Sequence, residues 1–168
     1  MQGPDAYRCR AFPPREAKRG MTVKLLLKHK GRFVPVIRSD LTLNNVIEQL
    51  HIDASGALVV TDDNEKILGI ITERDIARGL QRFGRGVVDR PLRELMSRDV
   101  ITVDIGETIN RVLELMNRHQ IHYVPVTDQG DLVGIITMLD IVKYRLAEIE
   151  LEANALKAYV AGRSEPTA

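Results

Sequence analysis

The sequence contains an internal repeat, and this repeat limits the possible folds more than any other feature. Residues 58–63 and 69–76 align without a gap with residues 123–128 and 134–141, at an offset of 65. In the second of these pairs, Gly-Ile-Ile-Thr-Glu-Arg-Asp-Ile matches Gly-Ile-Ile-Thr-Met-Leu-Asp-Ile at six of eight positions. A unit of about 50 residues buries too little surface to be stable alone, so the repeat predicts two similar units packed together.

Each unit has the pattern β-α-β-β-α. Apolar residues at i, i+3, i+4 and i+7 follow Thr42 and Thr108, which we expect to cap short amphipathic helices. A second helix is expected to begin at Thr72 and at Thr137. The predicted fold class is α/β (α+β), with two β-α-β-β-α repeats packed in pseudo-two-fold symmetry and a long C-terminal helix. The expected strands are 33–37, 57–61 and 67–71 in the first unit, and 100–103, 123–127 and 132–136 in the second.

The repeat also divides the chain into five parts. A Gly- and Pro-containing stretch separates the two units, and a Pro-containing basic stretch without apolar periodicity precedes the first. The expected parts are a disordered basic extension (1–20), a first repeat (21–80), a connector with a short helix around Leu92–Met96 (81–98), a second repeat (99–146) and a C-terminal helix extension and tail (147–168).

The last helix is expected to continue beyond its repeat. Apolar residues recur at spacings of 4, 3, 4, 3 and 4, which is typical of a coiled-coil seam. This face either packs back onto its own repeat or pairs with a second subunit, and the length of the helix favours a homodimer. The seam consists of Val142, Leu146, Ile149, Ala153, Leu156 and Val160.

Composition narrows the function classes. The 168 residues carry 24 basic and 23 acidic side chains, and aromatic residues make up 4% with no Trp, which argues against nucleic-acid binding. The single cysteine, Cys9, excludes an intramolecular disulfide framework and a cysteine metal cluster. The sequence shows no apolar run long enough to span a membrane and no secretory signal, so we expect a cytoplasmic protein. Whether residues 1–20 belong to the natural protein stays open, because Met21 is an alternative start.

The duplicated Gly-Ile-Ile-Thr-x-x-Asp motif carries the candidate chemistry. Its glycine has no Cβ and permits close approach to the backbone. Its threonine lies at a strand-to-helix junction, where free N–H groups and the helix dipole favour an anion such as phosphate. Its aspartate could accept hydrogen bonds from the two hydroxyls of a ribose. The alternative for a single Thr-x-x-Asp is a helix capping box, with no ligand at all.

The paired motifs resemble a tandem cystathionine-β-synthase (CBS) domain pair, also called a Bateman module. The resemblance covers residues 21–160 and rests on residues 58–60, 69–75, 122–126 and 134–140. In particular, the chain resembles stand-alone bacterial CBS-pair proteins, which have no catalytic domain. The resemblance implies a regulatory or sensory homodimer that binds adenosine nucleotides such as AMP, ADP, ATP or NAD(H) in two clefts between the repeats. It also implies a role such as energy sensing, exerted on an unknown client.

The resemblance also implies roles for individual residues. Thr72 would hold a phosphate and Asp75 the ribose, and Thr137 and Asp140 would do the same in the second repeat. The base would be surrounded by Val34, Val36 and Ala57 in the first repeat, and by Thr102, Val103, His122 and Pro125 in the second.

The two clefts are expected to differ in charge. Arg74 lies between Thr72 and Asp75, where the second repeat has Met138 and Leu139, so we expect the more phosphorylated end of a ligand near Arg74. Arg74 as a solvated helix residue is the alternative. His122 can be neutral at pH 7, so its cleft could be weakly selective for anions or sensitive to pH.

Other chemistries lack support in the sequence. His119 and His122 are three residues apart, but no third ligand for a metal lies nearby. The sequence has no Gly-x-Ser-x-Gly motif and no Walker loop, so we predict that the chain is not an enzyme and requires no metal. The alternative to a nucleotide sensor is a ligand-free interaction module that binds a partner protein, or nucleic acid through its basic extension. The ligand, the occupancy of both clefts, the client and the dimer orientation stay open.

Overall fold

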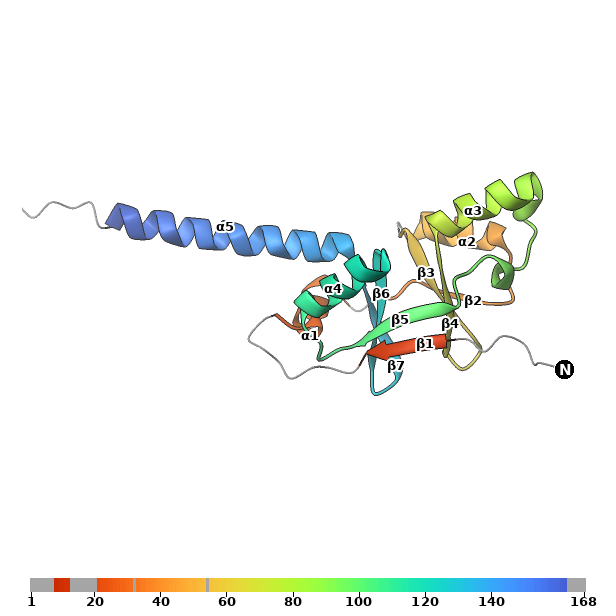
Figure 1. Cartoon of the computed structure of the whole chain (residues 1–168), viewed down its shortest axis with the longest axis horizontal. Coiled ribbons are helices and arrows are strands. Elements are labelled where there is room, and N and C mark those ends of the chain that lie inside the picture. Colours follow the sequence, from red (N-terminus) through yellow and green to blue (C-terminus); the bar gives the residue numbers. More distant parts are fainter. Residues whose placement is uncertain (1–7, 13–20, 32, 54, 163–168) are drawn as a thin grey trace, which may run out of the picture.

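The structure is a computed structural model that describes residues 8–12, 21–31, 33–53 and 55–162. Two small sheets and short helices form the body, and a long C-terminal helix projects from it (Figure 1). The strands are β1 (Arg8–Phe12), β2 (Val36–Arg38), β3 (Ala57–Thr61), β4 (Ile67–Thr72), β5 (Asp99–Asp104), β6 (Tyr123–Asp128) and β7 (Asp131–Thr137). The helices are α1 (Val23–Lys30), α2 (Leu43–Ile52), α3 (Glu73–Phe83), α4 (Ile109–His119) and α5 (Met138–Gly162), with short 3₁₀ turns η1 (Gly84–Val87) and η2 (Leu92–Glu94).

The two repeats build their sheets in the same way, which confirms the predicted fold class. One sheet has the order β2-β3-β4 and the other β1-β5-β6-β7. In both, the first strand of the repeat runs parallel to the second, and the second and third strands form an antiparallel pair. The capping threonines predicted from the sequence, Thr42, Thr72 and Thr108, directly precede α2, α3 and α4. The strand expected at 33–37 is shorter and lies at Val36–Arg38.

The helix that precedes each repeat packs into the core of the other repeat. Leu27 of α1 is buried with Val103 and Ile136 of the second repeat. Leu92 of η2 is buried with Leu58 of the first repeat, although it follows that repeat in the chain. This exchange joins the two repeats into one module, because neither core is complete without a segment from the other side of the repeat boundary.

The glycine of each Gly-Ile-Ile-Thr motif makes this exchange possible. A Cβ on Gly69 would lie 2.8 Å from Met96 Sδ and 2.9 Å from the Ser97 carbonyl oxygen. A Cβ on Gly134 would lie 2.6 Å from Leu27 Cδ1. The sequence-based prediction of a close approach at these glycines is therefore confirmed, and the approaching groups belong to the exchanged segments rather than to a ligand.

The N-terminal stretch differs from the disordered extension expected for residues 1–20. Arg8–Phe12 form β1, which pairs in parallel with β5 from Arg8↔Asp99 to Phe12↔Val103. Arg10 Nε lies 3.0 Å from Asp99 Oδ1. The physical reason is that β5 would otherwise be the edge strand of its sheet, and β1 pairs with this open edge on the side opposite β6. The other residues of this stretch lie outside the described part of the chain.

Candidate functional site

Two clefts lie between the repeats, and each is lined by residues of both. The first cleft has a volume of about 470 Å³ and the second about 530 Å³. The first cleft is lined by Gly56, Ile70, Thr72–Asp75, Arg78, Ser97, Asp99–Ile101 and His119–Tyr123. The second cleft is lined by Lys30, Gly31, Phe33, Pro35, Asp53, Ser55, Gly56, His122, Tyr123, Ile135 and Thr137–Leu139.

The linings of the two clefts correspond through the internal repeat. The Thr-x-x-Asp junction of one repeat faces the start of the first strand of the other repeat, so Thr72 shares a cleft with Val100, and Thr137 with Pro35. Each cleft is also lined by the segment that precedes the second strand of the opposite repeat, His119–His122 before β6 in the first cleft and Asp53, Ser55 and Gly56 before β3 in the second. The pseudo-two-fold relation predicted from the sequence extends to the candidate site.

In the first cleft, Thr72 and Asp75 form a compact hydrogen-bonded pair. The Thr72 hydroxyl and the Thr72 backbone N–H donate to Asp75 Oδ2 over 2.7 and 2.9 Å. Ser97 Oγ donates to the other carboxylate oxygen, Oδ1, over 3.3 Å. Asp75 is only 8% exposed, and it also starts α3 as part of a capping box. The capping alternative is therefore confirmed as a structural role, and the same two residues also line a cleft.

Two arginines of α3 border the first cleft one helical turn apart. Arg74 Nη1 donates to the Gln120 carbonyl oxygen across the cleft, over 3.4 Å. Arg78 Nη1 lies 3.9 Å from Asp75 Oδ1, and the Arg78 side chain is 69% exposed. Both guanidinium groups are held by weak contacts only, so they can turn toward an anion that enters the cleft.

The second cleft repeats the capping pair with different neighbours. The Thr137 hydroxyl and backbone N–H each donate to Asp140 Oδ2 over 2.8 Å. Lys30 Nζ of α1 also reaches Asp140 Oδ2, over 2.6 Å, and donates to the Ile135 carbonyl oxygen over 3.0 Å. Met138 and Leu139 occupy the places of Glu73 and Arg74. The second cleft is therefore more apolar at the start of its helix.

A thin wall separates the clefts. Gly56, His122 and Tyr123 line both of them. A Cβ on Gly56 would overlap the Tyr123 hydroxyl group, so the tyrosine ring can lie across this position only because residue 56 is glycine. Burial raises the pKa of the Tyr123 phenol, and the nearby Glu73 carboxylate adds to this shift. The hydroxyl group of Tyr123 therefore remains a neutral hydrogen-bond donor at the wall.

The predicted site residues fall into two groups. Thr72, Arg74 and Asp75 line the first cleft, Thr137 lines the second, and His122 lines both. Asp140 is held by Thr137 at the edge of the second cleft. The residues expected around the base lie outside these two linings: Val34, Val36, Ala57, Thr102, Val103 and Pro125.

The position of these residues along their strands explains why they lie outside the two linings. Ala57, Thr102 and Val103 are fully buried within the sheets, whereas Val36 is 47% exposed. The residues that border the clefts come slightly earlier in the chain, at Asp99–Ile101 at the start of β5 and at Phe33 and Pro35 just before β2. Thr72 was expected to share its cleft with first-repeat residues, whereas its cleft is completed by the second repeat.

Several lining residues were missed by the sequence analysis. Arg78, Ser97, Gln120, Ile121 and Tyr123 line the first cleft. A helical period from Arg74 would have found Arg78, because residues four apart share a face. Ser97 and Gln120 could not be found in this way, because Ser97 follows the exchanged segment η2 and Gln120 belongs to the opposite repeat, so only the packing of the two repeats brings them to the cleft.

The described residues contain no group of three or more His, Cys, Asp or Glu side chains placed to hold a metal ion. Across the same part of the chain, no helix combines the length and apolar character needed to cross a membrane, and this includes α5.

Comparisons with solved structures agree with this architecture. The chain is similar to the CBS-domain containing protein ATU1752 from Agrobacterium tumefaciens, with 34% identity and a TM-score of 0.73 over 74% of this chain and 99% of that one. It is also similar to the CBS domain pair of protein MJ0100, solved in complex with 5′-methylthioadenosine and S-adenosyl-L-methionine. That likeness has 28% identity and a TM-score of 0.66, over 76% of this chain and 98% of the other.

Curated proteins show the same relationship over part of their length. An uncharacterized protein from Methanocaldococcus jannaschii, MJ1232, is 41% identical over 90 residues, which are 53% of this chain and 28% of that protein. An uncharacterized protein from Methanopyrus kandleri, MK0525, is 36% identical over 101 residues, 58% of this chain and 52% of that protein. The chain thus spans about a quarter and about half of these two relatives. The CBS domain family model matches residues 30–82 and 92–147, more than half of the chain, and the chain therefore belongs to the CBS domain family.

Proposed function

We propose that this chain is a non-catalytic regulatory module that binds an adenosine nucleotide, AMP, ADP, ATP or NAD(H), between its CBS repeats. The supporting observation is the first cleft, where Thr72, Asp75 and two arginines of one repeat face His119–Tyr123 of the other. A threonine, a carboxylate and guanidinium groups can hold phosphate and ribose hydroxyls together. The likeness to the CBS domain pair of MJ0100, solved with two adenosine-containing molecules, points to the same ligand class.

A thermal-shift screen tests the nucleotide proposal. A ligand that binds only the native state at 100 times its Kd stabilises by about 2.7 kcal/mol, which raises Tm by roughly 5–11 °C for a chain of this size. We expect such a rise with at least one of AMP, ADP, ATP and NADH, and a smaller one with CTP. An unchanged Tm with all four adenine nucleotides would contradict the proposal and favour the ligand-free interaction module.

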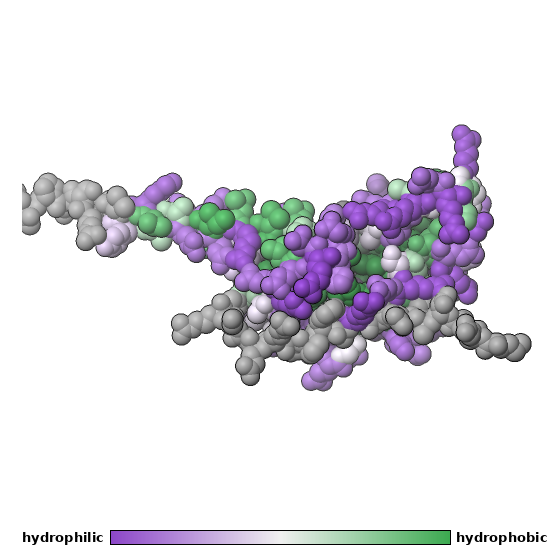
Figure 2. Space-filling view, in the orientation of Figure 1, coloured by the Kyte–Doolittle hydropathy of each residue, from purple (hydrophilic) through white to green (hydrophobic). Residues whose placement is uncertain are grey.

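The module is further proposed to act as a homodimer, and α5 supports this. A row of large apolar side chains on α5 is between 53% and 65% exposed: Leu139, Val142, Leu146, Ile149 and Leu156. Figure 2 shows hydrophobic side chains along one side of this helix. At the start of the helix, Ile141 is 1% exposed and packs in the core of the second repeat. Helices in proteins gain most of their stability from packing an apolar face, so a second copy is the expected partner of this row.

Light scattering on two matched variants tests the dimer. Leu146→Glu places a charge in the apolar row and should convert the dimer to a monomer. Leu151→Glu is the control, because Leu151 is 71% exposed but lies outside the row. A monomeric mass for the unmodified protein, or equal effects of both substitutions, would argue against pairing through this row. A cytoplasmic location and the client of the module stay predictions from the sequence.

A further inference from the structure

The lining of the first cleft contains two arginines, and the positions of their guanidinium groups indicate the class of ligand. Arg74 reaches the Gln120 carbonyl oxygen on the wall formed by the second repeat. Arg78 lies toward Asp75, whose carboxylate also accepts a hydrogen bond from Ser97. The two positive groups therefore border different sides of the cleft, although their Cα atoms are one turn, or ~6 Å, apart along α3.

Two of the three carboxylates in the same lining, Asp75 and Asp99, already have partners. Asp99 pairs with Arg10 of β1 over 3.0 Å. Asp75 accepts two hydrogen bonds from Thr72 through one oxygen and one from Ser97 through the other. Glu73 stands at the first turn of α3 beside the Tyr123 phenol. The arginines contact neighbouring groups only at 3.4 and 3.9 Å, so an entering anion can replace these contacts with shorter ones.

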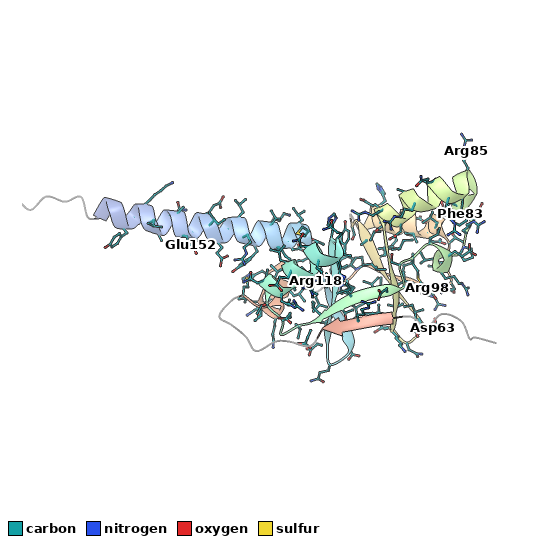
Figure 3. The ribbon with its side chains drawn as sticks, viewed as in Figure 1. Asp63, Phe83, Arg85, Arg98, Arg118 and Glu152 are labelled. Carbon is teal, nitrogen blue, oxygen red and sulfur yellow. The ribbon has the colours of Figure 1, made fainter. Side chains whose placement is uncertain are left out.

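The basic residues farther along α3 and just after it, Arg82 and Arg85, do not line the first cleft. Arg82 contacts the Phe83 ring, with its guanidinium carbon 4.9 Å from the ring centre. Arg85, past the end of the helix, points outward from the body (Figure 3). Among the described residues, the arginines in the lining of the first cleft are Arg74 and Arg78, which fits a short chain of phosphates rather than a long polyanion.

The second cleft lacks this pair. Leu139 lines it at the place of Arg74, and its lysine, Lys30, is bound to Asp140 over 2.6 Å. The residue that corresponds to Arg78 is Lys143, which is exposed on α5 outside the lining of the second cleft. Among the residues that the structure describes, a ligand with several negative charges therefore finds two guanidinium groups in the first cleft and none in the lining of the second.

We propose that the first cleft selects adenosine ligands with two or more linked phosphates, one held by Arg74 and the next by Arg78, and that the second cleft does not. This rests on the proposed function and adds the ligand class and a second phosphate-binding residue. A diphosphate or triphosphate can engage both guanidinium groups through neighbouring phosphates, whereas a single phosphate would have to draw both groups away from their present contacts with Gln120 and Asp75.

Calorimetric titration with ATP, AMP and inorganic tripolyphosphate tests this inference at one fixed salt concentration. We expect ATP to bind more tightly than AMP, and Arg78→Ala to weaken ATP binding by about tenfold to a hundredfold, as loss of a charge-assisted hydrogen bond does. AMP binding should change by less than about threefold, since a single phosphate would keep Arg74. Arg78→Lys should restore part of the ATP affinity, because it keeps the charge but not the planar fork.

The matched control is Lys143→Ala, which removes the corresponding cation of the second repeat and should leave ATP binding unchanged. An ATP-to-AMP ratio that Arg78→Ala does not alter would overturn the inference, as would an equal loss with Lys143→Ala. If neither ATP nor AMP binds, the proposed nucleotide-binding function is wrong, and this result alone does not decide the role of the arginine pair. The arginine pair is then judged by tripolyphosphate alone: binding lost on Arg78→Ala supports it, and no binding to the unmodified protein overturns it.

Discussion

The first and second clefts share their backbone plan but present different charges to a ligand. In both, a threonine at the end of a strand and an aspartate in the next helical turn form the same hydrogen bonds, between 2.7 and 2.9 Å to one carboxylate oxygen. Arg74 and Arg78 border the first cleft, whereas Leu139 and an ion-paired Lys30 border the second. The shared residues begin a helix, so ligand preference must come from the residues that differ around them.

The exchanged segments should be equally important in both halves, and their loss should have the largest effect. Leu27 and Leu92 are 1% and 0% exposed in opposite cores. Leu27→Ala and Leu92→Ala should each lower the free energy of unfolding by about 2–5 kcal/mol, because each leaves a cavity. Urea denaturation measures this. A loss below about 1 kcal/mol at either position would mean that this half does not depend on the exchange.

The motif glycines should show a difference between the halves. A Cβ on Gly69 meets the Ser97 backbone as well as Met96, whereas the three atoms nearest to a Cβ on Gly134 all belong to the Leu27 side chain. Gly69→Ala should therefore cost about 1–3 kcal/mol of unfolding free energy, and Gly134→Ala clearly less. Chemical denaturation of the two variants, side by side, checks the order. The reverse order would show that the Ser97 backbone moves more easily than the Leu27 side chain.

Substitution of the two capping threonines distinguishes an effect on stability from an effect on ligand binding. Thr72→Ala and Thr137→Ala should each reduce the free energy of unfolding by about 1 kcal/mol, since both remove a helix cap. Only Thr72→Ala should also weaken ATP binding, and titration of both variants measures this. An unchanged stability in both would mean that the capping hydrogen bonds contribute nothing, and equal losses of ATP affinity would remove the distinction between the clefts.

The ion pair of the second cleft should have the smallest effect. Lys30 and Asp140 side chains are 29% and 17% exposed, so solvent screens their attraction in part. Lys30→Met, which removes the charge and keeps a long side chain, should change the unfolding free energy by less than about 1 kcal/mol. Added salt should lower the stability of the unmodified protein more than that of the variant. Identical salt dependence of the two proteins would show that the pair is not formed in solution.

Local patterns were sufficient for α2 to α5, the antiparallel strand pairs and the Thr-x-x-Asp junctions, whereas α1 (Val23–Lys30) was not predicted. Thr42, Thr72 and Thr108 could be recognised as caps because capping depends on neighbours within one turn. The same holds for the close approach at Gly69 and Gly134, although the approaching group could not be named.

Residues whose position depends on the other repeat could not be predicted. Val36, Thr102 and Val103 belong to the right strands, but only the packing of the sheets decides which residues reach a cleft. Strand β1 was not predicted for a similar reason, because its partner residues on β5 lie 91 positions away in the chain, as in the pair Arg8↔Asp99. Pairing over such a distance leaves no periodic signal in a five-residue segment.

A crystal structure grown with ATP tests the central claim most directly, because it locates the ligand and both arginines at once. The account predicts ATP in the first cleft, with its ribose at Asp75 and successive phosphates at Arg74 and Arg78. Phosphates beside Lys30 in the second cleft, with the first cleft empty, would contradict it.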